Sequence, residues 1–426
     1  MRLRNLPLVV QRLGVVVRNR AARRLRQVRQ YVRRRTKDMR ETAKGLRASV
    51  RSGFARGRDA GSHARSGLVR TARYWRRVQL QTTPRLAREM AVRRELRAAA
   101  RGSGPIIVGP WLSEVGYEAL YWLPFLRWFC DRYHVHRSRL VVVSRGGVAD
   151  WYREIADQYV ELLDLMSVEA FAAANAERQR GSEQKQHTIA PFDRTILARV
   201  RERPGLGSAT LCHPSTMFRL LRGFWLGNES LEYVQEHMRY ARVASDERPF
   251  VDLPALPESF VAVKFYTGKA IPDTPAHRQC LRELVERVAE RSPIVALDTG
   301  IAIDDHEDYL FRDVANVISL ARWLTPANNL GVQTAVIRRA ERFVGTCGGL
   351  AWLAPLLGTD TVAVFADEDF LAPHLYAARQ AYRTAGAARF STIDLDAAAI
   401  MGLDGAPVEA ACAAPSVSLE SPVEPR

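Results

Sequence analysis

The stretch RFVGTCGGLAWLAPLLGTDTVAVF (342–365) decides the fold of this chain. Its apolar and β-branched runs at 342–346 and 361–365 predict two buried strands, and the small apolar segment 349–357 between them predicts a helix. A strand, a glycine-rich turn, a helix and a second strand form a βαβ unit, and such units build parallel sheets. The segment therefore predicts an α/β fold.

The same alternation of strand and helix patterns continues upstream. It predicts further strands at 260–266, 293–300 and 315–320, with helices at 275–291, 329–341 and 370–384. An earlier series predicts strands at 105–109, 139–144, 160–165 and 209–214, helices at 116–130 and 149–158, and a polar loop at 176–187. Three prolines in 245–259 indicate a linker between the two series.

These patterns divide the 426 residues into four parts. We expect a basic helical extension at 1–102, a first Rossmann-like domain at 103–245, a second at 246–400, and a disordered tail rich in Ala, Pro and Ser at 401–426. The predicted fold class is α/β, with two Rossmann-like domains facing a cleft and an N-terminal basic helical extension.

The net charge of +17 belongs to the N-terminal quarter. Residues 1–101 contain 30 Lys and Arg against 5 Asp and Glu, and the rest of the chain is acidic. Apolar residues recur at steps of three and four from Leu3 to Phe54, which predicts a helix with one apolar face. Residues 1–100 are therefore a candidate anchor on an anionic membrane surface, and a solvated basic helix explains the pattern equally well. Few aromatic residues interleave the arginines, so nucleic acid is the weakest candidate partner.

A second basic helix is expected from Thr83, as N-cap, to Gly102. The five cysteines are scattered and form no CxxC pair, which favours a reducing compartment over a disulfide framework or a zinc site. No apolar run approaches the roughly 18 residues that span a bilayer. We expect the chain in the cytoplasm, with the inner face of the cell membrane as a second location if the basic extension binds lipid.

The glycine-rich turn carries the strongest functional signal. Gly345, Gly348 and Gly349 let the backbone approach a ligand closely, and the next helix offers free N–H groups and the positive end of its dipole. Thr346 adds a hydroxyl. At the carboxyl edge of a parallel sheet, these groups predict a cradle for a phosphate or a diphosphate. The structural alternative is a turn required only for tight packing of the helix on the strand.

A strand, a Gly/Thr turn, a small-residue helix and a second strand resemble the donor-site segment of GT-B-type glycosyltransferases, in particular the heptosyltransferase-like branch. In that family the loop holds the diphosphate of the donor. The branch has an Asp before the glycine turn and a His in the helix, whereas this chain has Thr346, Cys347 and Trp352. The resemblance implies a metal-independent enzyme without a cofactor.

Lys264 ends the first strand of the second predicted domain, in VAVKFY (261–266). The resemblance implies a lysine here that faces the leaving diphosphate, and a fixed cation stabilises the negative charge that develops on a departing phosphate. Tyr266 is a candidate to stack on the base or to bond the ribose. A solvated lysine at a strand end is the alternative.

The segment GPWLSEVGYEALYWLPFLRW (109–128) follows the first strand of the first predicted domain. It resembles the acceptor-side loop of the same family, in which an acidic residue takes a proton from the attacking hydroxyl. Glu114 and Glu118 are equal candidates for this general base, because their spacing does not decide between them. The alternative is that both acids only complement a helix dipole.

Three further polar residues are weaker candidates for donor binding. Asp298 follows a predicted strand, and Asn329 and Gln333 open a predicted helix, where capping is the simpler explanation. The triplet Asp367-Glu368-Asp369 has the pattern of a metal motif, but it precedes a helix that acids cap naturally. We therefore expect no metal site.

The sequence predicts a glycosyltransferase that moves a sugar from a nucleotide-diphosphate donor to a glycan or lipid-linked acceptor, with a role in surface polysaccharide synthesis. One alternative is a nucleotide-sugar epimerase or hydrolase. The other is a non-catalytic scaffold at the membrane that binds nucleotide sugars or glycans.

Overall fold

The computed structural model divides the chain into two units, residues 1–85 and 86–426. The structure describes residues 87–181, 185–245, 253–301, 307–366 and 371–396, all of them in the second unit. The amphipathic stripe predicted between Leu3 and Phe54, the acidic triplet 367–369 and the tail predicted from 401 lie outside the described residues.

The first lobe of the second unit contains a parallel sheet of four strands in the order β3-β2-β1-β4. The strands are β1 (Ile106–Val108), β2 (Leu140–Ser144), β3 (Gln158–Glu161) and β4 (Thr210–Cys212). The α-helices are α3 (Val115–Tyr117), α4 (Leu123–Tyr133), α5 (Val168–Arg180), α6 (Pro191–Arg201), α7 (Pro214–Trp225) and α8 (Leu231–Glu236). A π-helix, η2 (Glu118–Trp122), joins α3 to α4, and short 3₁₀ helices are η3 (Arg137–Arg139), η4 (Ala149–Tyr152) and η5 (Leu162–Asp164).

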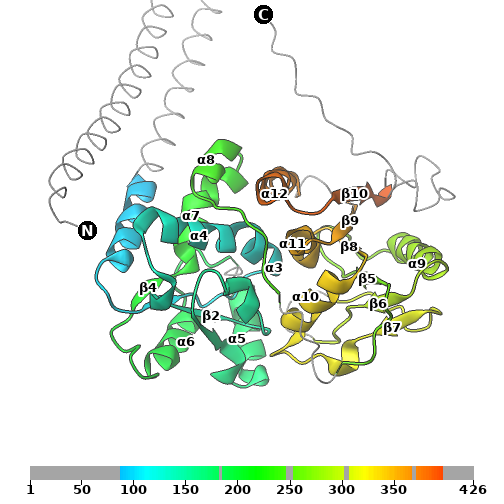
Figure 1. The fold of residues 1–426 in the computed structure, drawn as a ribbon, viewed down its shortest axis with the longest axis horizontal. Coiled ribbons are helices and arrows are strands. Elements are labelled where there is room, and N and C mark those ends of the chain that lie inside the picture. Colours follow the sequence, from blue (N-terminus) through cyan, green and yellow to red (C-terminus); the bar gives the residue numbers. More distant parts are fainter. Residues whose placement is uncertain (1–86, 182–184, 246–252, 302–306, 367–370, 397–426) are drawn as a thin grey trace, which may run out of the picture. The chain divides into compact units, whose positions relative to one another are not determined.

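The second lobe contains a parallel sheet of six strands in the order β10-β9-β8-β5-β6-β7. The strands are β5 (Val261–Lys264), β6 (Ile294–Ala296), β7 (Val317–Ser319), β8 (Arg342–Thr346), β9 (Asp360–Phe365) and β10 (Phe390–Asp394). The helices are α9 (Pro275–Ala289), α10 (Asn329–Arg339), α11 (Gly349–Leu357), α12 (Ala372–Ala385) and the 3₁₀ helix η6 (Ala321–Trp323). The two parallel α/β sheets confirm the predicted fold class (Figure 1).

The inner strands of both sheets are buried on both faces, which explains why β2, β5, β8 and β9 are short, mostly apolar runs. The edge strands β3, β7 and β10 are partly exposed. Successive side chains of a strand point to opposite faces, so Ile106 and Val108 enter one core cluster and Ile107 enters another. In β5, Ala262 enters the first of these clusters, while Val261 belongs to a third.

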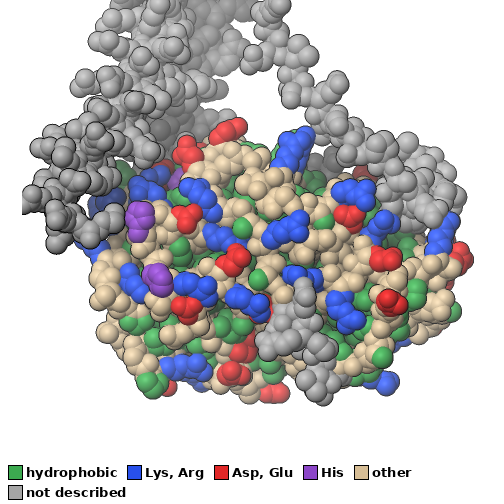
Figure 2. All heavy atoms as spheres, in the orientation of Figure 1, with side chains coloured by type: hydrophobic (Ala, Val, Ile, Leu, Met, Phe, Trp, Pro, Cys, Tyr) green, Lys and Arg blue, Asp and Glu red, His purple; other side chains and the backbone are tan. Residues whose placement is uncertain are grey.

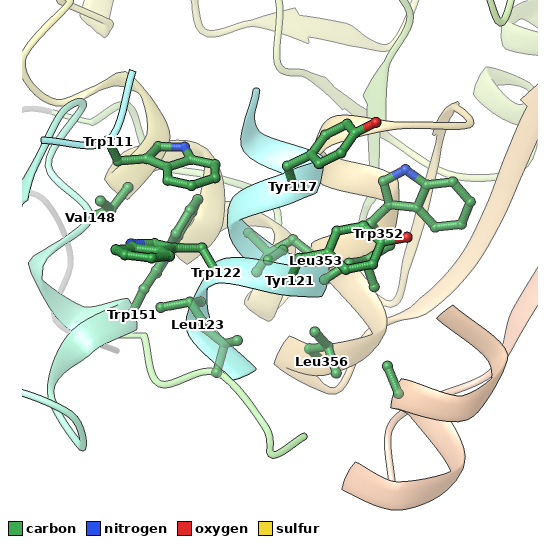
Figure 3. Packing of buried hydrophobic residues seen from close by; sticks show 14 of the residues in the cluster. Trp111, Tyr117, Tyr121, Trp122, Leu123, Val148, Trp151, Trp352, Leu353 and Leu356 are labelled. Atoms are coloured by element: carbon green, nitrogen blue, oxygen red, sulfur yellow. The ribbon is translucent and has the colours of Figure 1, made fainter. Parts of the chain in front are cut away.

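One core cluster runs through both lobes. It joins the aromatic residues of η2 and α4 to the apolar helix α11 of the second lobe, and α3 lies beside α11 (Figure 1). The rings of Trp111 and Trp122 stack, with their centroids 5.6 Å apart. Figure 3 shows this part of the cluster, with Tyr117 from the first lobe and Trp352 from the second. The lobes therefore share apolar packing behind the cleft that the sequence predicts.

Two predictions for the first lobe were wrong. A helix was expected at 149–158, but the segment forms only the short 3₁₀ helix η4, and β3 begins at Gln158. A loop was expected from 176, but α5 continues to Arg180, since the buried Arg178 of its last turn bonds Leu112 and Asn175. The predicted strand at 160–165 also ends earlier, at Glu161.

The second basic helix is described over residues 87–100. Val92, Leu96 and Ala99 on one of its faces are buried in the core cluster that both lobes share. In this segment the apolar face therefore packs on the body of the protein. Acidic and basic side chains alternate over the face shown in Figure 2 without forming a single patch of one charge. Each helix in the described part of the chain is too short or too polar to cross a membrane.

Candidate functional site

The order of the strands in the second sheet indicates the edge at which a ligand would bind. From β7 through β6, β5, β8 and β9 to β10, the strands follow the doubly wound order, which reverses direction between β5 and β8. Open α/β sheets bind ligands at the carboxyl ends of the strands beside such a reversal. Lys264, at the end of β5, pairs in register with Gly345, near the end of β8. The two strongest predicted donor-binding segments therefore meet at this point.

A cavity of about 710 Å³ opens at this edge, between the two lobes. The first lobe contributes Glu114, Gly116, Tyr117, Arg145, Arg178 and Lys185 to its wall. The second lobe contributes Lys264, Tyr266, Lys269, Gln333, Gly348 and Gly349. The volume suits a ligand larger than a monosaccharide.

The glycine turn reaches the cavity through Gly348 and Gly349. A Cβ on Gly348 would lie 2.5 Å from the phenolic oxygen of Tyr266, so a side chain at this position would have to displace the Tyr266 ring. Across the cleft, a Cβ on Gly116 would lie 2.8 Å from Cδ1 of Trp352 and 3.3 Å from the amide nitrogen of Gly349. The start of α11 therefore lies directly against the backbone of the first lobe, beside the cavity.

Thr346 and Gly345 support the turn from beneath it and are absent from the cavity wall. Thr346 is 1% exposed, and its hydroxyl accepts a hydrogen bond from the backbone N–H of Tyr266 (3.0 Å) and donates one to the Tyr266 carbonyl oxygen (3.2 Å). A Cβ on Gly345 would lie 2.3 Å from the carbonyl oxygen of Lys264. Both residues fix the two strand ends to each other, which is a packing role.

The ammonium of Lys264 is already engaged within the second lobe. It lies 2.8 Å from Oδ1 of Asp308 and donates to the carbonyl oxygen of Leu297 at 3.0 Å. Asp308 also lines the cavity and accepts hydrogen bonds from the backbone N–H and the hydroxyl of Thr299. Any anion that binds Lys264 therefore competes with a carboxylate that three donors hold in place.

The two candidate bases occupy different environments. Glu114 is the N-cap of α3 with extended backbone angles, so its side chain stands outside the helix, lines the cavity and is 47% exposed. Glu118 opens the π-helix η2, is 1% exposed and lies outside the cavity wall. Its carboxylate accepts hydrogen bonds from Ser144 (2.9 Å) and from the hydroxyl of Tyr152. Of these two glutamates, Glu114 lines the cavity and Glu118 does not.

Burial determines the protonation of Glu118. Loss of hydration raises the pKa of this carboxyl to about 7, although the hydrogen bonds from Tyr152 and Ser144 and the charge of Arg145 act in the opposite direction. Glu118 is therefore a partly protonated core residue at neutral pH.

The remaining predicted donor residues are divided between wall and core. Asp298 is 4% exposed and is held by Arg312 (3.0 Å) and the hydroxyl of Ser319 (2.7 Å), away from the cavity wall. Asn329 and Gln333 line the cavity. Gln333 is 2% exposed and donates to the Asn329 carbonyl oxygen at 3.0 Å, while its Oε1 has no hydrogen-bond partner among the described residues. Such a buried, unsatisfied amide favours a ligand that supplies a hydrogen bond.

Several cavity residues were missed in the sequence. Five basic and two acidic side chains line the wall, so its net charge is positive. Arg178 and Lys185 belong to the segment predicted as a polar loop, and Lys269 lies in a turn without a recognisable motif. Arg178 is 6% exposed and donates to Asn175 Oδ1 at 2.8 Å and to the carbonyl oxygen of Leu112. In the sequence, these three residues share only a positive charge close to the predicted cleft, and many solvated loops contain such charges.

His374 also lines the cavity and connects the lobes. Its Nε2 lies 3.2 Å from the hydroxyl of Tyr117 and its Nδ1 lies 2.9 Å from the hydroxyl of Tyr121. Burial lowers the pKa of His374 to about 3, with a further contribution from the charge of Lys185. The ring is therefore neutral, with a phenol at each nitrogen.

Two more hydrogen bonds join the lobes. The backbone N–H of Gly331 donates to the carbonyl oxygen of Gly146 (2.8 Å), and the indole of Trp151 donates to the hydroxyl of Thr334 (3.2 Å). A Cβ on Gly331 would lie 2.4 Å from the carbonyl oxygen of Gly147. These contacts fix the positions of the two cavity walls relative to each other.

The described residues contain no group of three or more His, Cys, Asp or Glu side chains that is placed to hold a metal ion. The four described cysteines are free thiols, and burial raises the pKa of Cys347, beside the glycine turn, to about 12.

No protein-family profile and no curated protein matches the sequence. Among solved structures, the chain is similar to a glycosyl transferase family 9 protein from Veillonella parvula, with 13% identity over 70% of this chain and 88% of that one, at a TM-score of 0.38. It is similar to the E. coli heptosyltransferase WaaC with ADP, with 14% identity over 71% of this chain and 100% of that one, at a TM-score of 0.35.

A third similar structure is a UDP-N-acetylglucosamine 2-epimerase from Listeria monocytogenes, with 9% identity over 62% of this chain and 79% of that one, at a TM-score of 0.26. The structural neighbours thus include the heptosyltransferases that the sequence resembles, at TM-scores that leave the assignment of function to the chain's own residues.

Proposed function

We propose that this chain is a glycosyltransferase that moves a sugar from a nucleotide-diphosphate donor to a glycan or lipid-linked acceptor. One observation carries the proposal: a positively charged cavity between two α/β lobes has a glycine turn at a sheet reversal on one wall and an accessible glutamate, Glu114, on the other. The first wall suits a diphosphate, and the second wall suits an attacking hydroxyl.

The second lobe would bind the donor. The backbone at Gly348 and Gly349 lies at the start of α11, where first-turn N–H groups lack partners inside the helix and attract anions. Asn329 and Gln333, on α10, offer amide groups to the base, the ribose or the sugar. Lys264 and Tyr266 complete this wall, with Lys264 acting beside Asp308.

Glu114 would act as the general base. It removes the proton of an acceptor hydroxyl as that oxygen forms a bond to the anomeric carbon of the donor sugar. The bond from this carbon to the phosphate oxygen breaks at the same time, and the nucleotide diphosphate leaves with the electron pair. Basic side chains on the cavity wall stabilise the negative charge that develops on it.

The N-terminal basic segment would bring the enzyme to its acceptor. Its excess of arginine over residues 1–101 suits an anionic lipid surface, on which each basic residue contributes about 1 kcal/mol. We propose a cytoplasmic enzyme that works at the inner face of the membrane in surface polysaccharide synthesis.

The test measures release of nucleotide diphosphate from ADP-, GDP-, UDP- and dTDP-sugars by the full chain, with and without a lipid-linked oligosaccharide extract. We expect acceptor-dependent release with one donor class. Glu114→Gln should lower turnover by about 10²- to 10⁴-fold, whereas Glu118→Gln should retain it, because Glu118 is outside the cavity.

Other results would support the alternatives. An isomerised sugar released without an acceptor would support an epimerase. Binding of a nucleotide sugar without turnover in any condition would support a scaffold. Equal turnover by the wild type and Glu114→Gln would refute the proposed base.

A further inference from the structure

Lys185 reaches the cavity from the first lobe, opposite the proposed donor wall. Its ammonium lies 3.2 Å from Oε1 of Glu114 and 3.3 Å from the centre of the Tyr117 ring. The side chain is 30% exposed, so it extends along the cavity wall instead of into open solvent. Two favourable partners, a carboxylate and an aromatic face, thus lie beside the charge.

Charges of the second lobe contribute to the electrostatic potential at Lys185. Burial lowers the pKa of Lys185, Glu114 acts in the opposite direction, and the ammonium of Lys269 adds to the lowering. Lys185 in turn contributes to the lowered pKa of His374. Lys269 and His374 both line the cavity from the second lobe. Two like charges therefore line the same cavity, one from each lobe, and an anion bound between them would offset their repulsion.

Lys264 is less able to meet that anion. Its side chain is 11% exposed, and it bonds Asp308 and the Leu297 carbonyl oxygen. Releasing Lys264 would break its bonds to Asp308 and to Leu297, and it would leave the Asp308 carboxylate with Thr299 as its donor. Among the described residues, the carboxylate paired with Lys185 is that of Glu114, whose side chain is 47% exposed and easily hydrated. An exposed ion pair of this kind contributes little and exchanges readily.

We propose that Lys185 of the first lobe, with Lys269 of the second, binds the diphosphate of the donor across the cleft, and that donor binding draws Lys185 away from Glu114. This assignment rests on the proposed function. Lys185 then has two effects: it stabilises the leaving diphosphate, and it leaves the carboxylate of Glu114 available for the acceptor hydroxyl. The diphosphate site is thus completed by both lobes, and a donor is required before the base is released.

Titration calorimetry tests the assignment of Lys185 and does not require that the acceptor be known. Each of ADP, GDP, UDP and dTDP is titrated into the full chain, together with its nucleoside, which lacks the diphosphate. For the diphosphate that binds, Lys185→Met should raise the dissociation constant by about tenfold to a hundredfold, as expected for loss of a hydrogen bond to a charged group. Its nucleoside should bind both proteins equally. Lys185→Arg should retain most of the affinity.

Two further variants test the competition with Glu114 and provide a control. Glu114→Gln removes the competing carboxylate, so it should lower the dissociation constant of the diphosphate by about twofold to fivefold, the range of an exposed ion pair. Arg379→Gln removes one charge from α12, outside the cavity wall, and should leave binding unchanged. Unfolding midpoints of every variant show whether the fold is retained, and Lys185→Gln replaces Lys185→Met if that variant fails to fold.

The outcomes separate this assignment from the function on which it rests. If the wild type binds none of the diphosphates, the proposed function fails. If the wild type binds one and Lys185→Met binds it equally well, the function stands and the Lys185 assignment is wrong. If diphosphate and nucleoside lose affinity together, Lys185 only shapes the cavity. If binding is unchanged while turnover falls, Lys185 positions Glu114 and does not contact the donor.

Discussion

The carboxylate of Asp308 lies 2.8 Å from the ammonium of Lys264, and both side chains are nearly buried, at 13% and 11% exposure. The pair connects the end of β5 to the loop that follows β6. Thr299 adds two hydrogen bonds to the same carboxylate. The lysine that the sequence presents as a cation for the ligand is therefore also a structural residue.

Removing one member of this pair should be costly. Asp308→Leu leaves the Lys264 ammonium without its carboxylate in a region of low hydration, and we expect a loss of about 3 kcal/mol in the free energy of unfolding. The double variant Lys264→Met/Asp308→Leu should lose less than the sum of the two single variants. Urea unfolding of all four proteins measures the coupling. Additive losses would show that the two charges do not stabilise each other.

Stability should depend on pH through Glu118. Its folded pKa of about 7 lies above the ordinary carboxyl value of 4.5. The contribution of Glu118 to stability is therefore fully present below pH 4.5, and it is lost as the pH rises from there through 7. Glu118→Gln cannot ionise and should remove this loss, which amounts to about 2–3 kcal/mol at pH 8. Urea unfolding at pH 5 and pH 8 measures it. A difference between the wild type and Glu118→Gln that is equal at both pH values would contradict the raised pKa.

His374 should act in the opposite direction. Its folded pKa of about 3 lies below the unfolded value of 6.5, so the unfolded state binds the proton first and the fold loses stability as the pH falls from 6.5 toward 3. His374→Gln removes that proton-binding site. Between pH 6.5 and pH 4.5, the wild type should lose about 2–3 kcal/mol more than the variant. Parallel stability curves over this range would rule out a buried neutral imidazole.

The contact between Gly348 and Tyr266 gives a steric prediction. In Gly348→Ala, the new methyl group would meet the phenolic oxygen of Tyr266 at 2.5 Å, and we expect a cost of about 1–2 kcal/mol with loss of diphosphate binding. Tyr266→Phe removes the oxygen and should restore most of both properties in the double variant. Gly104→Ala is the matched control, because a Cβ there has nothing within 4 Å.

Much of the fold was predictable because strand and turn patterns are local. The runs in β2, β5, β8 and β9 are β-branched and bounded by glycine or charge, and each was placed within two residues. The helical regions were harder. Trp151 and Tyr152 are both buried, although they come from the single 3₁₀ turn η4, so the apolar residues of 149–158 reflect tertiary packing and not a helix.

The site was predictable only in part. Lys264 and the glycine turn follow strands, so the rule for parallel sheets brought them together. Glu114 and Glu118 are chemically alike, so the sequence could not distinguish them. In the structure, Glu114 is the exposed N-cap of α3, whereas Glu118 begins a π-helical turn that buries its side chain. Lys185 and Lys269 come from loops, whose positions depend on packing between the lobes.

The central claim is that a nucleotide diphosphate binds between the glycine turn and the loop after β1. Hydrogen–deuterium exchange of the full chain, with and without the diphosphate that binds, measures this directly. We expect slower exchange at Gly348–Ala351 on one wall and at Glu114–Tyr117 on the other. Protection confined to other segments, or unchanged exchange at saturating ligand, would contradict it.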